Sequence, residues 1–537
     1  MKSSRPNLNR RTVLAAAAAL MPATAWLKTT GSPMSNIRVI ERSLSDLQAD
    51  LTAGRISAQQ LAAAYLARIE HIDRAGPHLA SVIELNPEAL DIARALDAER
   101  KVKGARGALH GLPILIKDNI DTRDRMHTTA GSLALLEAKP PEDAFIVQRL
   151  RAAGAVILGK SNLSEWANIR SSQSTSGWSA RGGLTRNPHA LDRNASGSSS
   201  GSAAAVAASL CAAAVGSETD GSILSPASVC GIVGLKPTVG LLSRSGIIPI
   251  AHSQDTAGPM ARGVRDCALL LGAMTGVDAR DAAMQGSAPH SLTDYTSALD
   301  AKALQGARLG VARQFFGFHD VVEQAYVPVL AALRRAGAVL IDPVTLPAIE
   351  TINDAEMTVL LYELKADLAA YLQRLGPDAP VKSLADVIAF NQKYATRELA
   401  WFGQDLFEKA QAKGPLTDAA YLDARALCLR VARTEGIEAV MREHQLDALI
   451  APTGGPAWRS DTVLGDHFVG SSTTPAAVAG TPAITVPAAM MRGLPLGLSF
   501  FGNAWSEARL LGLAYAFEQA TQARRAPRYA ASVDLGR

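Results

Sequence analysis

The chain is 537 residues long and 48% apolar, which allows it to bury a large core. Its formal net charge is +4, but Lys2, Arg5, Arg10 and Arg11 supply four positive charges in the first 25 residues, which contain no acid. Without these charges the rest of the chain is close to neutral. The basic balance therefore gives no support to binding of nucleic acid or of an anionic membrane.

The first 25 residues have the pattern of an export signal. Asn9 to Leu14 reads Asn-Arg-Arg-Thr-Val-Leu, a twin-arginine pattern, and a short apolar run follows from Ala15 to Leu20. Ala23-Thr-Ala25 supplies the small residues of a cleavage site. The apolar run is much shorter than the roughly 20 residues that a membrane-spanning helix needs. We expect a twin-arginine signal over residues 1–25 and an exported protein of the periplasm or cell envelope, without a stable membrane anchor.

The next part of the chain begins with a helix and a buried strand. Ser57 and Gln60 form a capping-box pattern ahead of apolar residues with helical spacing. The short apolar run from Leu112 to Ile116 is typical of a buried strand. Such a strand would place Lys117 at its carboxyl end.

A helix, a glycine and a strand follow one another twice. The pattern predicts a helix from Phe145 to Ala153, the C′ glycine Gly154 and a strand from Ala155 to Leu158. Residues 333–341 repeat this arrangement. Helices that alternate with short buried strands favour an α/β fold.

The second half of the chain adds a helix-rich stretch and more strands. Residues 287–434 contain mostly helical patterns and none of the sequence motifs, which predicts a helical cover that could wall a substrate pocket. Apolar runs at 446–451, 483–486 and 494–501 predict further strands. No linker or charge run divides the chain after residue 40, so one large domain is expected.

Two well-known sequence motifs match this chain by residue type, but the secondary structure predicted around them does not suit either motif. Residues 154–161 satisfy the phosphate-loop expression, yet the central Ala-Val-Ile-Leu predicts a strand and the first glycine follows a helix. Gly-Ser-Ser-Ser-Gly would make Ser199 the nucleophile of an elbow, but the polar stretch 185–195 before it has no strand pattern. None of the ten histidines stands in a recognisable catalytic context. We therefore expect neither a nucleotide site nor a serine–histidine hydrolase.

The cysteines are too few and too scattered for a disulfide scaffold or a zinc site. We expect them to be small buried residues, and we expect no metal. They are Cys211, Cys230, Cys267 and Cys428.

Three motifs follow one another in a distinctive order. Lys117 ends Gly-Leu-Pro-Ile-Leu-Ile-Lys, Ser198 lies in Gly-Ser-Ser-Ser-Gly-Ser-Ala-Ala-Ala-Val, and Ser222 lies 24 residues later in Gly-Ser-Glu-Thr-Asp-Gly-Ser-Ile. Together they resemble the amidase signature family, serine hydrolases that use a Ser-Ser-Lys triad. The likeness runs from about residue 45 to residue 515, with further landmarks at 234–240, 253–259 and 493–498.

The resemblance implies one amidase domain over residues 45–515, built on a mixed β-sheet covered by helices on both faces. It implies that Ser222 is the nucleophile, that Ser198 relays a proton and follows a cis peptide bond, and that Lys117 is the base. No cofactor is implied. Because the base must be neutral, we expect burial to lower the lysine pKa from ~10.4 towards 7 or 8.

The loop before the nucleophile is expected to hold the oxyanion, through the backbone N–H groups of Thr219, Asp220 and Gly221. Here the chain departs from the family, which commonly reads Gly-Thr-Asp-Thr-Gly-Gly-Ser-Ile-Arg. Asp220 replaces the first of two glycines, and Leu224 replaces the arginine. Aspartate is less free than glycine in φ and ψ. The missing arginine argues against a substrate that needs a fixed cation there.

Within the family, the closest likeness is to bacterial peptide amidases, which remove the C-terminal amide of peptides. The matching stretches are 162–168, 177–183, 218–222 and 246–250. The sequence therefore predicts hydrolysis of a carboxamide to an acid and ammonia through an acyl-enzyme, with a peptide amide as the substrate. The alternatives are a broad amidase for small aliphatic or aryl amides, a glutamyl-tRNA amidotransferase-like subunit, and a non-catalytic peptide-binding protein. Oligomeric state and pocket walls leave no signal in the sequence.

Overall fold

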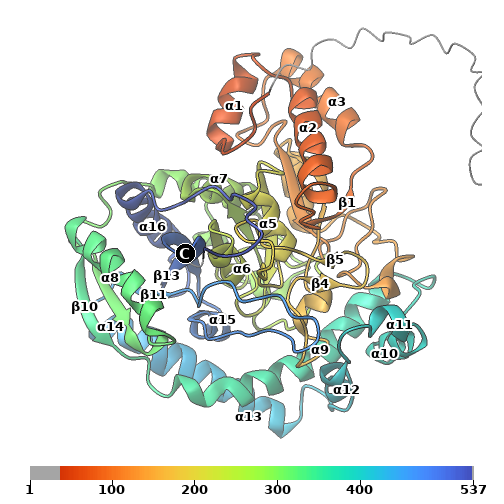
Figure 1. Ribbon diagram of the computed structural model, residues 1–537. Helices are drawn as coiled ribbons and strands as arrows, with labels where there is room; N and C mark the ends of the chain where they lie inside the picture. Colours follow the sequence, from red (N-terminus) through yellow and green to blue (C-terminus); the bar gives the residue numbers. More distant parts are fainter. Residues whose placement is uncertain (1–36, 535–537) are drawn as a thin grey trace, which may run out of the picture. The chain divides into compact units, whose positions relative to one another are not determined.

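The computed structural model describes residues 37–534, so the predicted signal over residues 1–25 lies outside the described part. An eleven-stranded mixed sheet runs through this part (Figure 1). In sheet order the strands are β1 (Val82–Leu85), β3 (Val156–Ser161), β2 (Pro113–Lys117), β6 (Ala213–Glu218), β8 (Thr256–Ala261), β7 (Val233–Lys236), β12 (Ala483–Met491), β13 (Leu494–Phe501), β11 (Ala448–Pro452), β9 (Arg308–Ala312) and β10 (Val339–Val344). A separate two-stranded ribbon pairs β4 (Trp178–Ser179) with β5 (Gly183–Leu184).

Helices accompany the sheet along the whole described chain and pack on both of its faces (Figure 1). They are α1 (Leu44–Thr52), α2 (Ala58–Arg68), α3 (Ala89–Lys103), α4 (Phe145–Ala152), α5 (Ser200–Ala207), α6 (Leu224–Val229), α7 (Val264–Met274), α8 (Asp320–Arg335), α9 (Asn353–Arg374), α10 (Leu384–Lys393), α11 (Ala395–Glu398), α12 (Asp405–Gln411), α13 (Ala419–Cys428), α14 (Glu438–Glu443), α15 (Thr474–Ala479) and α16 (Glu507–Thr521). The predicted α/β fold with a mixed sheet is confirmed. No helix in residues 37–534 combines the length and apolar character needed to cross a membrane.

Local sequence signals explain several of these elements. The Ser57 and Gln60 side chains form the expected capping box at the start of α2. After α4, Gly154 adopts φ +81°, which costs glycine little, and β3 follows. β3 contains residues 156–161 of the stretch that matches the phosphate-loop expression, so this stretch does not form a phosphate-binding loop.

Two neighbouring parallel strands position the candidate site. β2 pairs in parallel with both β3 and β6, and all residues of the three strands are buried. Continuous apolar runs suit strands that are covered on both faces. Since the carboxyl ends of parallel strands meet at one edge, Lys117 at the end of β2 and Glu218 at the end of β6 lie in the same region.

The predicted helical cover over residues 287–434 is only partly right. Its first part contains β9 and β10, which pair in parallel at the end of the sheet and are joined through α8. This is a strand–helix–strand unit. The pattern over residues 333–341 had predicted the end of α8 and the start of β10, whereas the short β9 leaves a weak signal. The later part is helical from α9 to α13, as expected. There Leu360, Leu364 and Phe407 share an apolar core with Leu163 and Trp166.

Candidate active site

A buried lysine lies at the centre of the candidate site. Lys117 Nζ lies 2.7 Å from Ser198 Oγ, 2.9 Å from Ser217 Oγ and 3.1 Å from the Ser217 carbonyl oxygen. The side chain is fully buried, and this burial lowers the pKa of Lys117 to about 7, although the carboxyl groups of Asp255 and Glu218 oppose the change. The neutral amine is therefore accessible near neutral pH.

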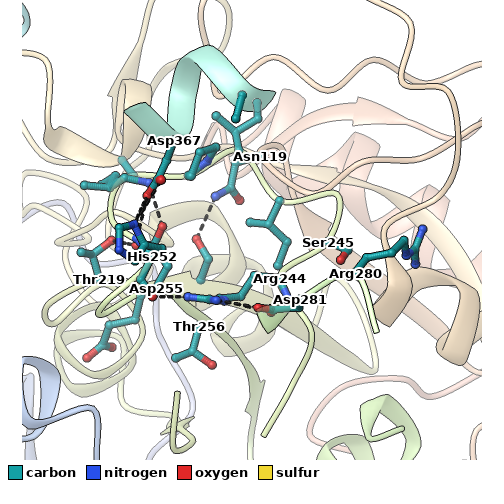
Figure 2. Close-up of a pocket in the computed structure, with 18 residues that line it drawn as sticks. Asn119, Thr219, Arg244, Ser245, His252, Asp255, Thr256, Arg280, Asp281 and Asp367 are labelled. Atoms are coloured by element: carbon teal, nitrogen blue, oxygen red, sulfur yellow. Dashed lines mark hydrogen bonds and ion pairs between the residues drawn. The ribbon is translucent and has the colours of Figure 1, made fainter. Parts of the chain in front are cut away.

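Ser217 and Asn119 fix the orientation of this amine. Ser217 offers two oxygen acceptors to Lys117, and Asn119 Nδ2 donates to Ser217 Oγ at 2.9 Å (Figure 2). With Ser198 Oγ, these oxygens match the three N–H groups of a lysine ammonium. A neutral amine keeps only two N–H groups, so its lone pair can face the third partner. Neither Ser217 nor Asn119 was predicted from the sequence, although they lie five residues before Ser222 and two residues after Lys117.

Ser198 lies between the lysine and the second serine motif. Its peptide bond to Gly197 is cis, as the family resemblance implies. The side chain is fully buried, and the backbone of the next residue, Ser199, donates its N–H to the carbonyl oxygen of Ser222 at 3.0 Å. This bond brings the Ser198 and Ser222 segments together, so the structure gathers Lys117, Ser198 and Ser222 in one region.

Ser222 lies in the loop between β6 and α6 and is 8% exposed. The Glu218 carboxylate closes this loop because it accepts from the N–H groups of Ile223 at 2.6 Å and Leu224 at 2.9 Å. Gly221 adopts φ +74°, which a residue with a side chain reaches only with strain. The loop therefore depends on a glycine directly before Ser222.

The expected oxyanion donors are available in this loop. No hydrogen bond in the described part of the chain uses the backbone N–H of Thr219, Asp220 or Gly221. Unpaired donors beside a nucleophile can bind the oxygen of a reacting carbonyl.

Asp220 does not strain the loop, contrary to the concern raised by its replacement of glycine. It has no positive φ, and its carboxylate accepts from the hydroxyl groups of Thr473 and Thr474, both at 2.6 Å. Burial raises the pKa of Asp220, while the two threonine hydroxyls oppose this change. Asp220 thus joins the loop to the start of α15, which is a contact that no sequence motif indicated.

The nucleophile-elbow alternative does not agree with the structure. Ser199 is fully buried, and its Oγ donates to the Ser217 carbonyl oxygen at 3.1 Å and accepts from the Ser217 N–H at 3.2 Å. Residues 185–195 contain no named strand. Within residues 37–534, no hydrogen bond joins a histidine to Ser198, Ser199 or Ser222. Ser199 therefore supports the Ser217 backbone.

Two cavities border the loop of residues 219–222. The Gly221 cavity, of about 240 Å³, is lined by residues that directly precede the two serines, together with aromatic and polar side chains: Gly197, Gly221, Asp220, Trp458, Asp466 and Phe468 are among them. The Asn119 cavity, of about 300 Å³, borders Asn119, Ser217 and Thr219 (Figure 2). Four of its charged side chains form two pairs, Arg244 with Asp281 and His252 with Asp367.

Comparisons with known proteins identify the family of the chain. A protein-family model described as Amidase matches residues 60–511. A peptide amidase structure from Stenotrophomonas maltophilia is 51% identical, covering 93% of this chain and all of that one, with a TM-score of 0.87. A probable amidase of Arabidopsis thaliana is 40% identical over 93% of each chain. A glutamyl-tRNA(Gln) amidotransferase subunit of Moorella thermoacetica is 37% identical over 90% of this chain and 96% of the relative. The chain is an amidase and belongs to the amidase signature family.

Proposed function

We propose that the chain hydrolyses the C-terminal amide of peptides with Ser222 as nucleophile, Ser198 as proton relay and Lys117 as base. The observation that carries the proposal is the 2.7 Å contact between Lys117 Nζ and Ser198 Oγ in a fully buried setting. Burial brings the lysine pKa to about 7, so the amine can accept a proton at neutral pH.

The reaction begins with two linked proton transfers. The neutral Lys117 amine takes the proton of the Ser198 hydroxyl, and Ser198 takes the proton of Ser222 as the Ser222 oxygen bonds to the carbonyl carbon. The carbonyl oxygen gains negative charge, which backbone N–H groups of residues 219–221 stabilise. Ser198 then gives one proton to the amide nitrogen, which leaves as ammonia, and Ser198 regains a proton from Lys117. Water hydrolyses the resulting ester and releases the acid.

Residue types at the site explain why lysine can replace histidine in this role. A lysine in water is protonated at neutral pH and could not act as a base. Complete burial removes most of the hydration of the ammonium and favours the neutral amine. Ser217 supplies acceptors that keep the amine beside Ser198. No metal or cofactor has a part in these steps.

The peptide amide is favoured over the alternative substrates by the similarity to a peptide amidase over the whole length of that protein. The plant relative is described only as a probable amidase, which leaves small amides as a second candidate. The amidotransferase interpretation is weaker because Leu224 occupies the position where the family commonly has an arginine. The Leu224 N–H donates to the Glu218 carboxylate, and its apolar side chain supplies no cation. A peptide-binding protein without activity would not need a neutral lysine beside Ser198.

The proposal is tested by ammonia release from a panel of purified compounds. An amidated dipeptide should be hydrolysed, whereas its free acid and a peptide with only internal amide bonds should release no ammonia. Acetamide and glutamine should react slowly or not at all. Faster turnover of acetamide or glutamine than of the dipeptide amide would favour a broad or glutamine-dependent amidase instead.

We also propose, from the twin-arginine pattern alone, that the protein is exported from the cytoplasm. Fusion of residues 1–25 to a reporter that is active only after twin-arginine export tests this. Replacement of Arg10 and Arg11 by lysine should retain the reporter in the cytoplasm, and unchanged export would contradict the proposal.

A further inference from the structure

The Gly221 cavity lies where the acyl half of a substrate would be held. Gly197 and Gly221, two of its lining residues, directly precede Ser198 and Ser222 in the chain. If the proposed function is correct, the leaving group is ammonia, which needs very little room. A cavity of about 240 Å³ beside the nucleophile is then available to the part of the substrate that stays attached as the acyl group.

One irregular segment forms part of this cavity. Residues 461–470, called here the 461–470 loop, contain no helix or strand, and Asp466 and Phe468 of this loop line the cavity. Asp466 anchors the loop: its carboxylate accepts from the N–H of Ser176 at 3.0 and 3.1 Å and from Trp458 Nε1 at 3.0 Å. The Asp461 carboxylate further accepts from two N–H groups of the loop, both at 2.9 Å.

The same loop exposes an unusual number of apolar side chains. Val463, Leu464, Phe468 and Val469 are 78%, 85%, 50% and 41% exposed. They are four of the sixteen exposed large apolar residues in the described chain, and they fall within seven consecutive positions. Single exposed apolar side chains are common, whereas several that lie close together mark a binding surface, and of these four Phe468 also lines the Gly221 cavity. An anchored loop that nevertheless keeps these side chains in solvent is suited to receive a ligand.

Two aromatic rings and two carboxylates form part of the cavity wall. The Trp458 and Phe468 rings pack edge to face with centroids 5.6 Å apart. The two carboxylates of the cavity already have partners in the protein: Asp466 binds Ser176 and Trp458, and Asp220 binds two threonine hydroxyls. The aromatic surface therefore remains available to a ligand, beside hydroxyl groups and the amide of Asn168, and the carboxylates disfavour an acidic ligand.

We propose that Phe468, Trp458 and the exposed apolar residues of the 461–470 loop form the subsite for the last side chain of the peptide amide, and that this subsite selects a large apolar residue. This inference rests on the proposed function and names its preferred substrate. Phe468 has a specificity-determining role, because it would contact the substrate side chain and not the reacting atoms.

The test compares two substrates that differ only in the last side chain, acetyl-Gly-Leu-NH2 and acetyl-Gly-Gly-NH2. The wild-type protein should hydrolyse the leucine amide with the higher kcat/KM. Phe468→Ala should lower the ratio of the two kcat/KM values by about ten-fold, as expected when a hydrophobic pocket loses part of its contact surface. Leu464→Ser, which changes an 85% exposed side chain and leaves the fold intact, should lower the ratio by a smaller factor.

Two control variants separate the subsite from other causes. Val102→Ser removes an equally exposed apolar residue, 82% exposed, on α3 and should leave the ratio unchanged. Ala370→Leu fills part of the Asn119 cavity, which Ala370 lines, and should also leave it unchanged. If Ala370→Leu changed the ratio and Phe468→Ala did not, the acyl side chain would belong in the Asn119 cavity and the inference would be overturned.

The remaining outcomes distinguish failure of the proposed subsite from failure of the proposed function. Equal hydrolysis of the two amides by the wild type, or a preference for acetyl-Gly-Asp-NH2 or acetyl-Gly-Arg-NH2, would overturn the subsite while leaving the proposed function intact. Release of ammonia from none of the peptide amides, with acetamide hydrolysed normally, would overturn the proposed function and the subsite with it.

Discussion

Two regions that border the candidate site are built in different ways. Lys117 and Ser217, at the ends of β2 and β6, are buried with Ser198, and Lys117 Nζ donates to the hydroxyl oxygens of both serines. The 461–470 loop, in contrast, has no regular structure and leaves four large apolar side chains in solvent. Under the proposed function, the ends of these strands fix the reacting groups, whose placement must be precise, while the anchored loop offers apolar contacts to the substrate. Changes in the first region should alter the rate for every amide, and changes in the second should alter the choice among amides.

Removal of the proposed nucleophile should have the largest effect. Ser222→Ala should reduce kcat for all amides by at least about 10³-fold, because it removes the oxygen that would bond to the carbonyl carbon. Ser199→Ala is the matched control; it removes a neighbouring buried hydroxyl that binds only the Ser217 backbone and should keep most of the activity. If Ser199→Ala were inactive and Ser222→Ala were not, the nucleophile elbow would replace the proposed triad.

The loop conformation is the next most sensitive feature. Gly221→Ala should lower kcat by about 10²–10³-fold, the effect of losing one oxyanion donor, because Gly221 has φ +74° and an added Cβ would lie 3.0 Å from Thr473 Oγ1. Gly54→Ala is a control with similar φ, +66°, and open space around the added atom. It should cost stability without a change in kcat. Equal effects of the two substitutions on kcat would show that catalysis does not depend on the backbone conformation at Gly221.

Loss of one lysine partner should have a smaller effect with a distinct signature. Ser217→Ala should lower kcat/KM by about ten-fold and shift its rising pH limb to lower pH. The sign follows because the Ser217 hydroxyl accepts from the ammonium form of Lys117, so its removal destabilises that form and lowers the lysine pKa further. Ser217→Thr keeps the hydroxyl and should restore the wild-type profile. A rate loss without a shift of the pH limb would indicate a structural role only.

Substitution of Gly154, which lies away from the candidate site, should lower stability without lowering activity. Gly154→Ala places a Cβ 2.8 Å from His110 Nδ1 at a position with φ +81°. It should lower the free energy of unfolding by about 1–3 kcal/mol, the usual range for backbone strain combined with crowding. In conditions where the variant is folded, kcat should stay unchanged. Denaturant unfolding and steady-state kinetics on the same preparation test both parts, and a large fall in kcat would contradict the separation.

The sequence predicted the parts of the fold that have strong local signals. The α4–Gly154–β3 unit and the position of Lys117 at the end of β2 follow from apolar runs and one C′ glycine. β9 was not expected, because a five-residue strand beside long helices has little periodicity of its own. The gathering of Lys117, Ser198 and Ser222 was expected from the family resemblance and not from local pattern.

Contacts between distant segments could not be predicted in the same way. The bonds from Thr473 and Thr474 to Asp220 join residues more than 250 positions apart. Likewise Asp466 fixes the 461–470 loop through Ser176, a residue 290 positions earlier. Single polar residues in irregular segments have no periodic sequence pattern, so their hydrogen-bond partners can be identified only from the folded structure. The walls of the Gly221 cavity belong to this class.

The pH dependence of kcat/KM for an amidated dipeptide tests the proposed role of Lys117 most directly. A lysine that must be neutral and has a pKa of about 7 gives activity that is low at pH 5.5, rises through pH 7 and levels off by about pH 8.5. Lys117→Met should lack activity at every pH. A wild-type profile that is flat between about pH 6 and 9, or an active Lys117→Met variant, would contradict the central claim that a neutral buried lysine drives the reaction.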